Sequence, residues 1–455
     1  MPGNFINTWM RGASGDREES KLSYWFLLAG GIFGILLIFL IPPFQNPDEP
    51  AHTFRVFHLA EGHLQGTQLA DRSGGYVPAW LIQLDSSMRY LRNHPEARMH
   101  PLEQDWQDHS FRFADFPNVS YYFPVGYLPF VLVARMTEWL GWSGPGVIFL
   151  LRITGLILWL MSIFWLMQAV PMGRLLTFVV ALLPGTLAVV CSISADVTSL
   201  VLVVLWLTLM LKKKAVRSEW LVTVALLFTL QRPNWWPLTL LILLQPQSVR
   251  QTWIKMANIL IPLLGTMAYV VMIRHEFITY SNYNPAFRDA LQINPGVDPQ
   301  AQLSFVFHDP QFFLHALFDT WLDIFGPVTR HLVGKFGWGA NYVSWYGFAA
   351  GLFALILAAS TNRDRFHRLE KLGFLWIAVA VVLMTSLILY LQWNPVGSTY
   401  IHGINGRYLI PILPLLLLAI PWRFHQLPRQ NMVVGILMVM ALGDLIIQVY
   451  VRYYA

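Results

Sequence analysis

Apolar runs of about 20 residues recur along the whole chain, with polar stretches between them. A run of that length, wound as an α-helix, can cross the hydrocarbon core of a bilayer. The first run covers residues 22–41, and later ones include 147–170, 174–191, 372–391 and 433–450, with shorter predicted spans such as 235–244. The pattern therefore predicts an all-α polytopic membrane protein that forms one integral-membrane domain over residues 1–455.

Lysine and arginine clusters orient the predicted spans, because cytoplasmic loops carry an excess of both residues. The strongest cluster lies within residues 212–217, with three lysines and one arginine. Placing every such cluster inside gives about 11 spans, with the N-terminus inside and the C-terminus outside. Residues 1–21 then form a cytoplasmic tail, and residues 42–146 and 274–341 form two large outer loops.

Two helices are expected beside the membrane in the first outer loop. Residues 50–62 begin with a proline suited to the first position of a helix and carry an apolar face, so we interpret them as a helix in the membrane surface. Residues 121–140 are apolar but interrupted by prolines and charges. Counting them as a span would place the lysine cluster outside, so we interpret them as a second juxtamembrane helix. In the second outer loop, residues 303–325 are expected to re-enter or lie flat.

Composition narrows the class of protein further. Of the 455 residues, 55% are hydrophobic and only 12% are charged, which excludes an ordinary soluble domain. The single cysteine, Cys191, excludes an internal disulfide and a cysteine-based metal site. The sequence contains no nucleotide fingerprint, and the net charge of +6 is interpreted as a topology signal. We therefore expect membrane lipid, and not nucleic acid, as a partner.

An acidic motif, Pro42-Pro-Phe-Gln-Asn-Pro-Asp-Glu-Pro-Ala-His52, follows directly on the first apolar run. Its Asp48 and Glu49 stand where a helix is predicted to start, and the positive end of the helix dipole should keep both ionised. Ionised carboxylates at a membrane face suit a general base or a cation site. The alternative is a helix cap beside a solvated acid. His52 would complete a metal site with the two acids, but this signal is weak, and we expect no metal and no other cofactor.

Further polar residues inside or beside spans are predicted on the same outer face. Asp196 opens a span, Arg232 lies at a short turn, and Lys335 and Arg407 lie in glycine-rich stretches. Such a cluster indicates a functional site, and glycine lets the backbone approach a ligand closely. The candidate substrate-binding residues are His52, Asp196, Arg232, Lys335, Trp338, Asn405, Arg407 and Tyr408.

Several of these residues have a structural alternative. Asp196 suits a helix cap as well as a ligand contact. Lys335 and Arg407 also fit ordinary interfacial side chains. Arg152, early in the second span, is expected to pair with an acid and not with a substrate. Three tryptophans are expected in the interfacial aromatic belt: Trp235, Trp236 and Trp338.

Three motifs together resemble the bacterial membrane family described as domain of unknown function 2142. They are the acidic motif, Val333-Gly-Lys-Phe-Gly-Trp338 and Gly403-Ile-Asn-Gly-Arg-Tyr408. The resemblance extends over nearly the whole chain. That family in turn resembles the GT-C glycosyltransferases, multi-span enzymes that use polyprenyl-phosphate sugars on the non-cytoplasmic face. The resemblance implies a GT-C-like helical bundle with juxtamembrane helices in its first outer loop.

The same resemblance implies roles for individual residues. An acidic residue or an Asp-Glu pair in the first outer loop marks the GT-C enzymes, and Asp48 and Glu49 match it, with Asp48 as the expected base. A second acid after the third span recurs in that class and corresponds to Asp196. No sequon-reading motif of the oligosaccharyltransferase type is visible, which favours a saccharide over a protein acceptor.

The expected function is inverting glycosyl transfer at the periplasmic or extracytoplasmic face of a bacterial inner membrane. A polyprenyl-phosphate sugar is the expected donor, and a cell-surface or lipid-linked saccharide is the expected acceptor. Asp48, alone or with Glu49, would deprotonate the acceptor. Arg407 and Lys335, with Arg232 as a weaker candidate, would stabilise the leaving phosphate. Two alternatives stay open: a transporter or flippase for lipid-linked sugars, and an O-antigen polymerase or ligase.

Overall fold

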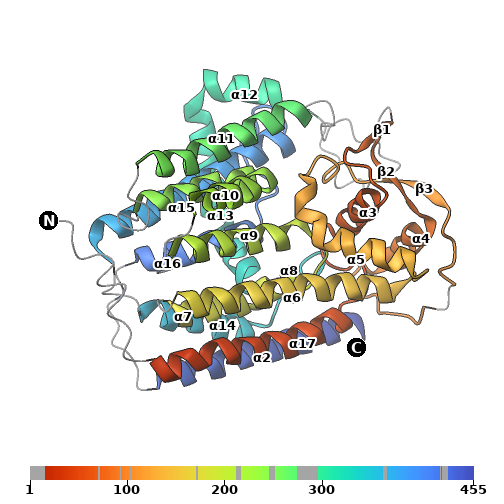
Figure 1. Ribbon diagram of the computed structural model, residues 1–455, viewed down its shortest axis with the longest axis horizontal. Helices are drawn as coiled ribbons and strands as arrows, with labels where there is room; N and C mark the ends of the chain where they lie inside the picture. Colours follow the sequence, from red (N-terminus) through yellow and green to blue (C-terminus); the bar gives the residue numbers. More distant parts are fainter. Residues whose placement is uncertain are drawn as a thin grey trace.

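The computed structural model shows a long helical bundle with a smaller α/β unit at one end (Figure 1). The structure describes residues 16–69, 72–92, 94–102, 105–170, 173–211, 217–244, 252–273, 296–361, 366–420, 422 and 429–455. Most of the predicted cytoplasmic tail, most of the 212–217 cluster and residues 274–295 of the second outer loop lie outside the described residues.

Within the described residues, five helices are long and apolar enough to cross a membrane. They are α2 (Asp16–Leu40), α6 (Pro145–Ala169), α11 (Thr252–Ile273), α15 (Arg368–Trp393) and α17 (Gln430–Tyr453). Large apolar side chains such as Leu264 and Trp376 are exposed on their outer surfaces. Exposure of this kind suits a surface that faces lipid, because lipid tails are as apolar as these side chains.

A sixth candidate span is broken in the middle. α8 (Pro184–Val190) and α9 (Ala195–Leu211) are long and apolar enough together, but they meet at a bend of 110°. Three further apolar segments are shorter: α10 (Ser218–Gln231), α14 (Trp345–Ser360) and Gly406–Ala419. The fold is thus mostly helical and consistent with a membrane protein, whereas the expected count of about 11 spans is not confirmed. Several predicted spans fall short of the roughly 20 residues that a bilayer requires.

Proline accounts for two of these differences. Residues 174–191, predicted as one span, form α7 (Arg174–Leu182) and α8, with the break at Leu183, which is extended at ψ 135°. Proline disfavours a helical conformation in the residue before it and cannot donate a backbone hydrogen bond. Residues 235–244 fall within η3 (Pro233–Leu244), a 3-10 helix that contains Pro237.

The first outer loop folds into an α/β unit, although the sequence predicted only helices there. α3 (Glu49–Ala60) and α4 (Ala79–Met88, followed by η1, Arg89–Leu91) pack against a three-stranded antiparallel sheet. The strands, in the order β1-β2-β3, are β1 (Thr67–Leu69), β2 (Arg72–Pro78) and β3 (Phe111–Asp115).

The sheet changes the interpretation of α3. Almost every residue of α3 is buried, including Arg55 and His58. At Gly75, strand β2 passes so close to the helix that a Cβ would lie 2.1 Å from the His58 ring. The prediction that this helix lies in the membrane surface is therefore wrong, because α3 is the core of the α/β unit.

The second predicted juxtamembrane helix corresponds to η2 (Pro124–Tyr127) and α5 (Leu128–Trp139). Twelve helical residues extend about 18 Å, which is too short to cross a bilayer. Leu132 and Trp139 are strongly exposed and give α5 an apolar outer surface. This geometry fits a helix at the membrane interface.

The described part of the second outer loop contains α12 (Pro299–His308) and α13 (Pro310–Gly334). The side chains of Asp298 and Asp309 accept backbone hydrogen bonds and cap the two helices. The predicted broken segment 303–325 therefore spans the joint between them. The end of α13 packs against α8 and η7 (Gly406–Ile412), which brings two of the three motifs together.

Candidate active site

The three motifs meet where the helical bundle joins the α/β unit. The acidic motif connects α2 to α3, residues 333–338 cover the end of α13 and the chain directly after it, and residues 403–408 lead into η7. Trp338 Nε1 donates a hydrogen bond to the carbonyl of Phe44 at 2.9 Å, and Arg407 pairs with Asp48 at 2.5 Å. Motifs that lie far apart in the sequence are thus in direct contact.

Asp48 precedes α3 in a left-handed backbone conformation, with φ 63°. Phe44, four residues earlier, has the same φ. Non-glycine residues rarely adopt this conformation, and such strain concentrates at functional sites. The Asp48 side chain does not cap α3; its carboxylate accepts a hydrogen bond from Arg407 and is 30% exposed. The capping alternative is therefore not observed for Asp48, which faces an open space.

Glu49 points in another direction and is completely buried with Arg152. Arg152 donates to both Glu49 oxygens, at 2.8 and 2.6 Å, and to the carbonyls of Ile38, Ile41 and Pro42. The backbone N–H of Ile193 also donates to Glu49. The prediction that Arg152 pairs with an acid is confirmed. Glu49 was expected beside Asp48 as a catalytic carboxylate. It is instead buried where α2, α6 and the turn before α9 meet.

Burial and nearby charges together set the pKa values of Asp48 and His52. Burial raises the pKa of Asp48, but the positive charge of Arg407 and the hydrogen bond from it lower this pKa by more, so it lies below its usual value. Burial is the main cause that lowers the pKa of His52 to about 4. His52 Nδ1 lies 2.7 Å from the Tyr127 hydroxyl. At neutral pH the site thus holds an ionised Asp48 and a neutral His52.

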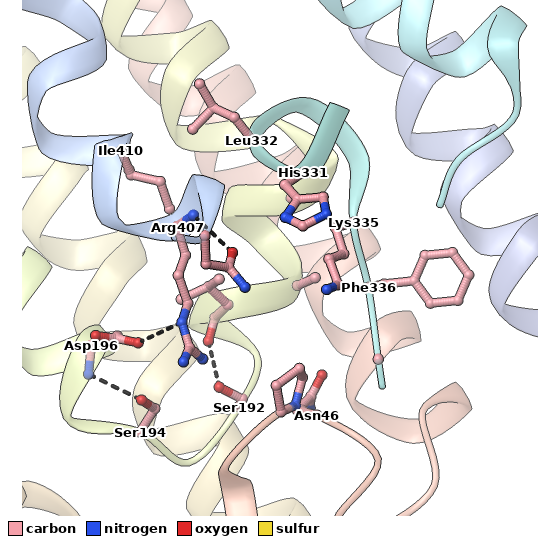
Figure 2. A pocket seen from close by; sticks show the side chains of 16 residues that line it. Asn46, Ser192, Ser194, Asp196, His331, Leu332, Lys335, Phe336, Arg407 and Ile410 are labelled. Carbon is pink, nitrogen blue, oxygen red and sulfur yellow. Dashed lines mark hydrogen bonds and ion pairs between the residues drawn. The ribbon is translucent and has the colours of Figure 1, made fainter. Parts of the chain in front are cut away.

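Asp196 lies in the first turn of α9 and joins two arginines. Its carboxylate forms an ion pair with Arg232. It forms a second ion pair, at 3.5 Å, with Nε of Arg407 (Figure 2). Arg232 also donates to the Tyr122 hydroxyl at 3.0 Å. Asp196 is 5% exposed, so it holds Arg232 and Arg407 in place more readily than it reaches a substrate.

Lys335 directly follows α13 and supplies a third cation. Within the described part of the chain, no acidic side chain forms an ion pair with it. Burial and the nearby charge of Arg407 lower the pKa of Lys335, partly offset by Asp48. The site therefore contains Arg232, Arg407 and Lys335 against Asp48 and Asp196, which leaves an excess of one positive charge.

Trp338 and its neighbour Gly337 anchor the second motif on the first. Arg92 lies over the Trp338 ring at 5.3 Å, in addition to the hydrogen bond from Trp338 to Phe44. Gly337 has φ 58°, and a Cβ there would lie 2.4 Å from the Tyr453 hydroxyl. Trp338 thus contacts the acidic motif and is not a belt residue.

The third motif is held by its own cap and by a buried tryptophan. The Asn405 side chain accepts a hydrogen bond from the backbone N–H of Arg407 and caps η7. Trp235 Nε1 donates to the Tyr408 carbonyl at 3.3 Å. Trp235 is 1% exposed, so its predicted place in an interfacial belt is wrong.

Two cavities lie on either side of Lys335 and Arg407. The outer cavity, of about 330 Å³, is lined by residues that include Asp48, His52, Tyr122, Arg232, Trp338 and Tyr408. The inner cavity, of about 40 Å³, is lined by residues that include Asn46, Ser192, Ser194, Asp196 and His331. Lys335, Asn405 and Arg407 line both. Of the ten predicted site residues, the structure brings all except Glu49 to one or both cavities.

Several polar residues that line these cavities were not predicted from the sequence. Asn46 belongs to the acidic motif but was not assigned to the site, and Tyr122 belongs to none of the three motifs. His331 reaches the inner cavity only because the last turn of α13 packs against α8 and η7. Among the described residues, no group of three or more His, Cys, Asp or Glu side chains is arranged to hold a metal ion.

Comparison with known proteins identifies the family. No curated protein and no solved structure matches the chain. The model of a family described as "Predicted membrane protein (DUF2142)" matches residues 31–416, a range that contains all three motifs. Because the match covers well over half of the chain, the protein belongs to the DUF2142 family of membrane proteins.

Proposed function

We propose that this protein is a glycosyltransferase that moves a sugar from a polyprenyl-phosphate donor to a saccharide acceptor. One observation carries the proposal: a partly exposed, ionised Asp48 lies beside Arg407 and Lys335 in an open cavity. A carboxylate next to two cations suits a reaction in which a proton is removed and a phosphate leaves.

In the proposed reaction, an acceptor hydroxyl oxygen attacks the anomeric carbon of the donor sugar. Asp48 takes the hydroxyl proton, the new C–O bond forms, and the bond between the anomeric carbon and the phosphate oxygen breaks. The bonding electrons leave with the polyprenyl phosphate, whose charge Arg407 and Lys335 stabilise. A single displacement of this kind inverts the anomeric carbon.

Arg407 has a second part in this proposal. It binds Asp48 at 2.5 Å and thereby lowers the basicity of the carboxylate. A donor phosphate attracts the same guanidinium, which prefers two parallel hydrogen bonds to a phosphate. Donor binding would therefore draw Arg407 away and make Asp48 a stronger base when the acceptor is deprotonated.

Localisation is part of the same proposal. We place the site at the extracytoplasmic face of the bacterial inner membrane, because the positive-inside rule assigns the first outer loop to that side. A transporter or flippase is the weaker candidate, since it should carry charges near the bilayer midplane on broken helices. Asp196 lies at the bend between α8 and α9, but the other site charges gather where the bundle meets the α/β unit.

The test is a transfer assay with the purified full-length protein in proteoliposomes. Polyprenyl-phosphate sugars are supplied with lipid-linked saccharide acceptors, and a glycosylated product that disappears in Asp48→Asn is the expected result. If no sugar is transferred while labelled polyprenyl-phosphate sugar crosses the bilayer in a wild-type-dependent way, the transporter replaces the enzyme as the function.

A further inference from the structure

The inner cavity brings two cations and several neutral polar side chains together beside Asp196. Figure 2 shows Lys335 reaching into it from one side and Arg407 from the other, with Asn46 and Ser192 below them. Asn46 is only 2% exposed, and its amide nitrogen has no hydrogen-bond partner among the described residues. A buried amide without a partner destabilises the protein, so a group that accepts a hydrogen bond from it would stabilise the site.

Two further groups add to this donor capacity. The Ser194 hydroxyl accepts from the Asp196 backbone N–H at 3.1 Å, and no described atom accepts from its own proton. Lys335 carries the excess positive charge of the site, as its ammonium forms no ion pair within the described residues. An unpaired ammonium, an amide and a hydroxyl together match the acceptor oxygens and negative charge of a phosphate.

The inner cavity also borders an apolar one. Ile410 lines both, and the second cavity, of about 190 Å³, lies between α6, α7, α9 and the Gly406–Ala419 segment. Its lining is apolar apart from Thr177, with side chains such as Trp159, Leu200 and Leu415. A ligand with a charged head and a long hydrocarbon tail would satisfy both cavities at once.

We propose that the inner cavity binds the phosphate of an isoprenoid lipid through Asn46, Ser194 and Lys335, with the tail passing Ile410 into the apolar cavity. This inference rests on the proposed function for its ligand class, and it adds the chamber and the donors that hold the phosphate. The outer cavity is then left to the saccharide, which approaches Asp48 from the opposite side of Arg407.

The test measures binding without any sugar, so it is independent of transfer activity. Geranylgeranyl phosphate is titrated against the purified protein in detergent, with geranylgeraniol and inorganic phosphate as the two partial ligands. We expect the phosphorylated lipid to bind more than about tenfold more tightly than either, because only it reaches both cavities. Equal affinity for inorganic phosphate would overturn the lipid assignment, and equal affinity for geranylgeraniol would overturn the phosphate site.

Variants locate the site within the protein. Asn46→Asp places a carboxylate where the amide stood, and Ser194→Ala removes one hydroxyl with little change in volume. We expect Asn46→Asp to weaken binding about tenfold or more and Ser194→Ala by a few-fold. The matched control is Gln392→Ala, which alters only the outer cavity and should bind the lipid like wild type.

Ile410→Trp tests whether the lipid tail passes from the inner cavity into the apolar cavity. The larger side chain should narrow the junction, so affinity for geranylgeranyl phosphate should fall while affinity for inorganic phosphate stays the same. If Ser194→Ala and Asn46→Asp both bind like wild type, or if Gln392→Ala weakens binding as much as they do, the inner-cavity assignment is wrong. Lipid binding that follows these variants in a protein without transfer activity would separate this inference from the proposed function.

Discussion

Glu49 and Asp48 are adjacent in the same motif and each pairs with an arginine, but the first pair is buried and the second is partly exposed. Glu49 and Arg152 are both 0% exposed, and every oxygen of the acid has a partner. Asp48 is 30% exposed and Arg407 17%, and the two share a single short hydrogen bond beside an open cavity. The first pair is enclosed by the chain, whereas the second can exchange its partner for a ligand.

The comparison shows that burial, more than residue type, separates a structural ion pair from a reactive one. A fully buried pair must satisfy all its hydrogen bonds within the protein, and breaking it leaves an uncompensated charge. Breaking an ion pair at a cavity wall costs less, because a substrate can replace one of the two partners. Four experiments follow from this contrast.

The largest effect should come from Asp48→Asn, which is nearly isosteric but cannot take a proton. Loss of a general base typically lowers the rate about 10²–10⁴-fold, while the melting temperature should stay close to that of wild type. Transfer rate and thermal unfolding of the purified variant measure both quantities. Full activity in a folded Asp48→Asn protein would remove Asp48 as the base.

Glu49→Gln should reverse this pattern, with a large loss of stability. Removing one partner of a buried pair typically costs roughly 3–5 kcal/mol, because Arg152 keeps its charge. Thermal and denaturant unfolding in detergent measure the loss, with Asp48→Asn as the matched control. Replacing both Glu49 and Arg152 by leucine should recover part of the stability. If Glu49→Gln melts like wild type but is inactive, Glu49 and not Asp48 is the catalytic acid residue.

Arg407→Lys should weaken use of the donor by an intermediate amount. A hydrogen bond to a charged group is worth roughly 1.5–3 kcal/mol, and lysine keeps the charge but not the planar fork. The KM for a polyprenyl-phosphate sugar should therefore rise in the variant. Arg89→Lys is the control, since Arg89 is an exposed partner of Asp85 away from both cavities. An unchanged KM in Arg407→Lys would argue against a bidentate contact with phosphate.

The smallest effect is a shift in pH dependence. Since Arg407 lowers the pKa of Asp48, wild-type kcat/KM should persist as the pH falls to the usual range of an aspartate and decline only below it. In Arg407→Gln, burial continues to raise the pKa, so the acid limb should move to higher pH. His52, with a pKa of about 4, gains its proton in the same range. The pH profiles of kcat/KM with Arg407 and with Arg407→Gln are therefore both measured in a His52→Gln protein. If the acid limb lies at the same pH in both, Arg407 does not lower the pKa of Asp48.

The sequence alone predicted the features that depend on neighbours along the chain. Apolar runs predicted α2, α6, α15 and α17 because a helix in lipid must be apolar over its full length. Pro50 predicted the start of α3 within a residue, since its fixed φ suits the first helical turn. The isolated charge of Arg152 in an apolar run required an acidic partner, and that expectation was correct.

Other features depended on contacts between distant segments, and the sequence could not supply them. The sheet of the α/β unit forms only when residues 72–78 and 111–115 pair across a long connection, and both segments look like loop in isolation. The buried state of α3 follows from the same sheet.

The tertiary structure likewise decided which of Asp48 and Glu49 faces the cavity and which is buried. On a helix, neighbouring side chains diverge by about 100°, so local sequence predicts that the two acids differ but not which one faces the cavity. Arg152 on α6 binds Glu49, and Arg407 in η7, 359 residues from Asp48 in the sequence, binds Asp48. These two contacts decide which acid faces the cavity. Local sequence determined which charged residues stand beside apolar runs, and packing between remote segments determined which of them stay open to a ligand.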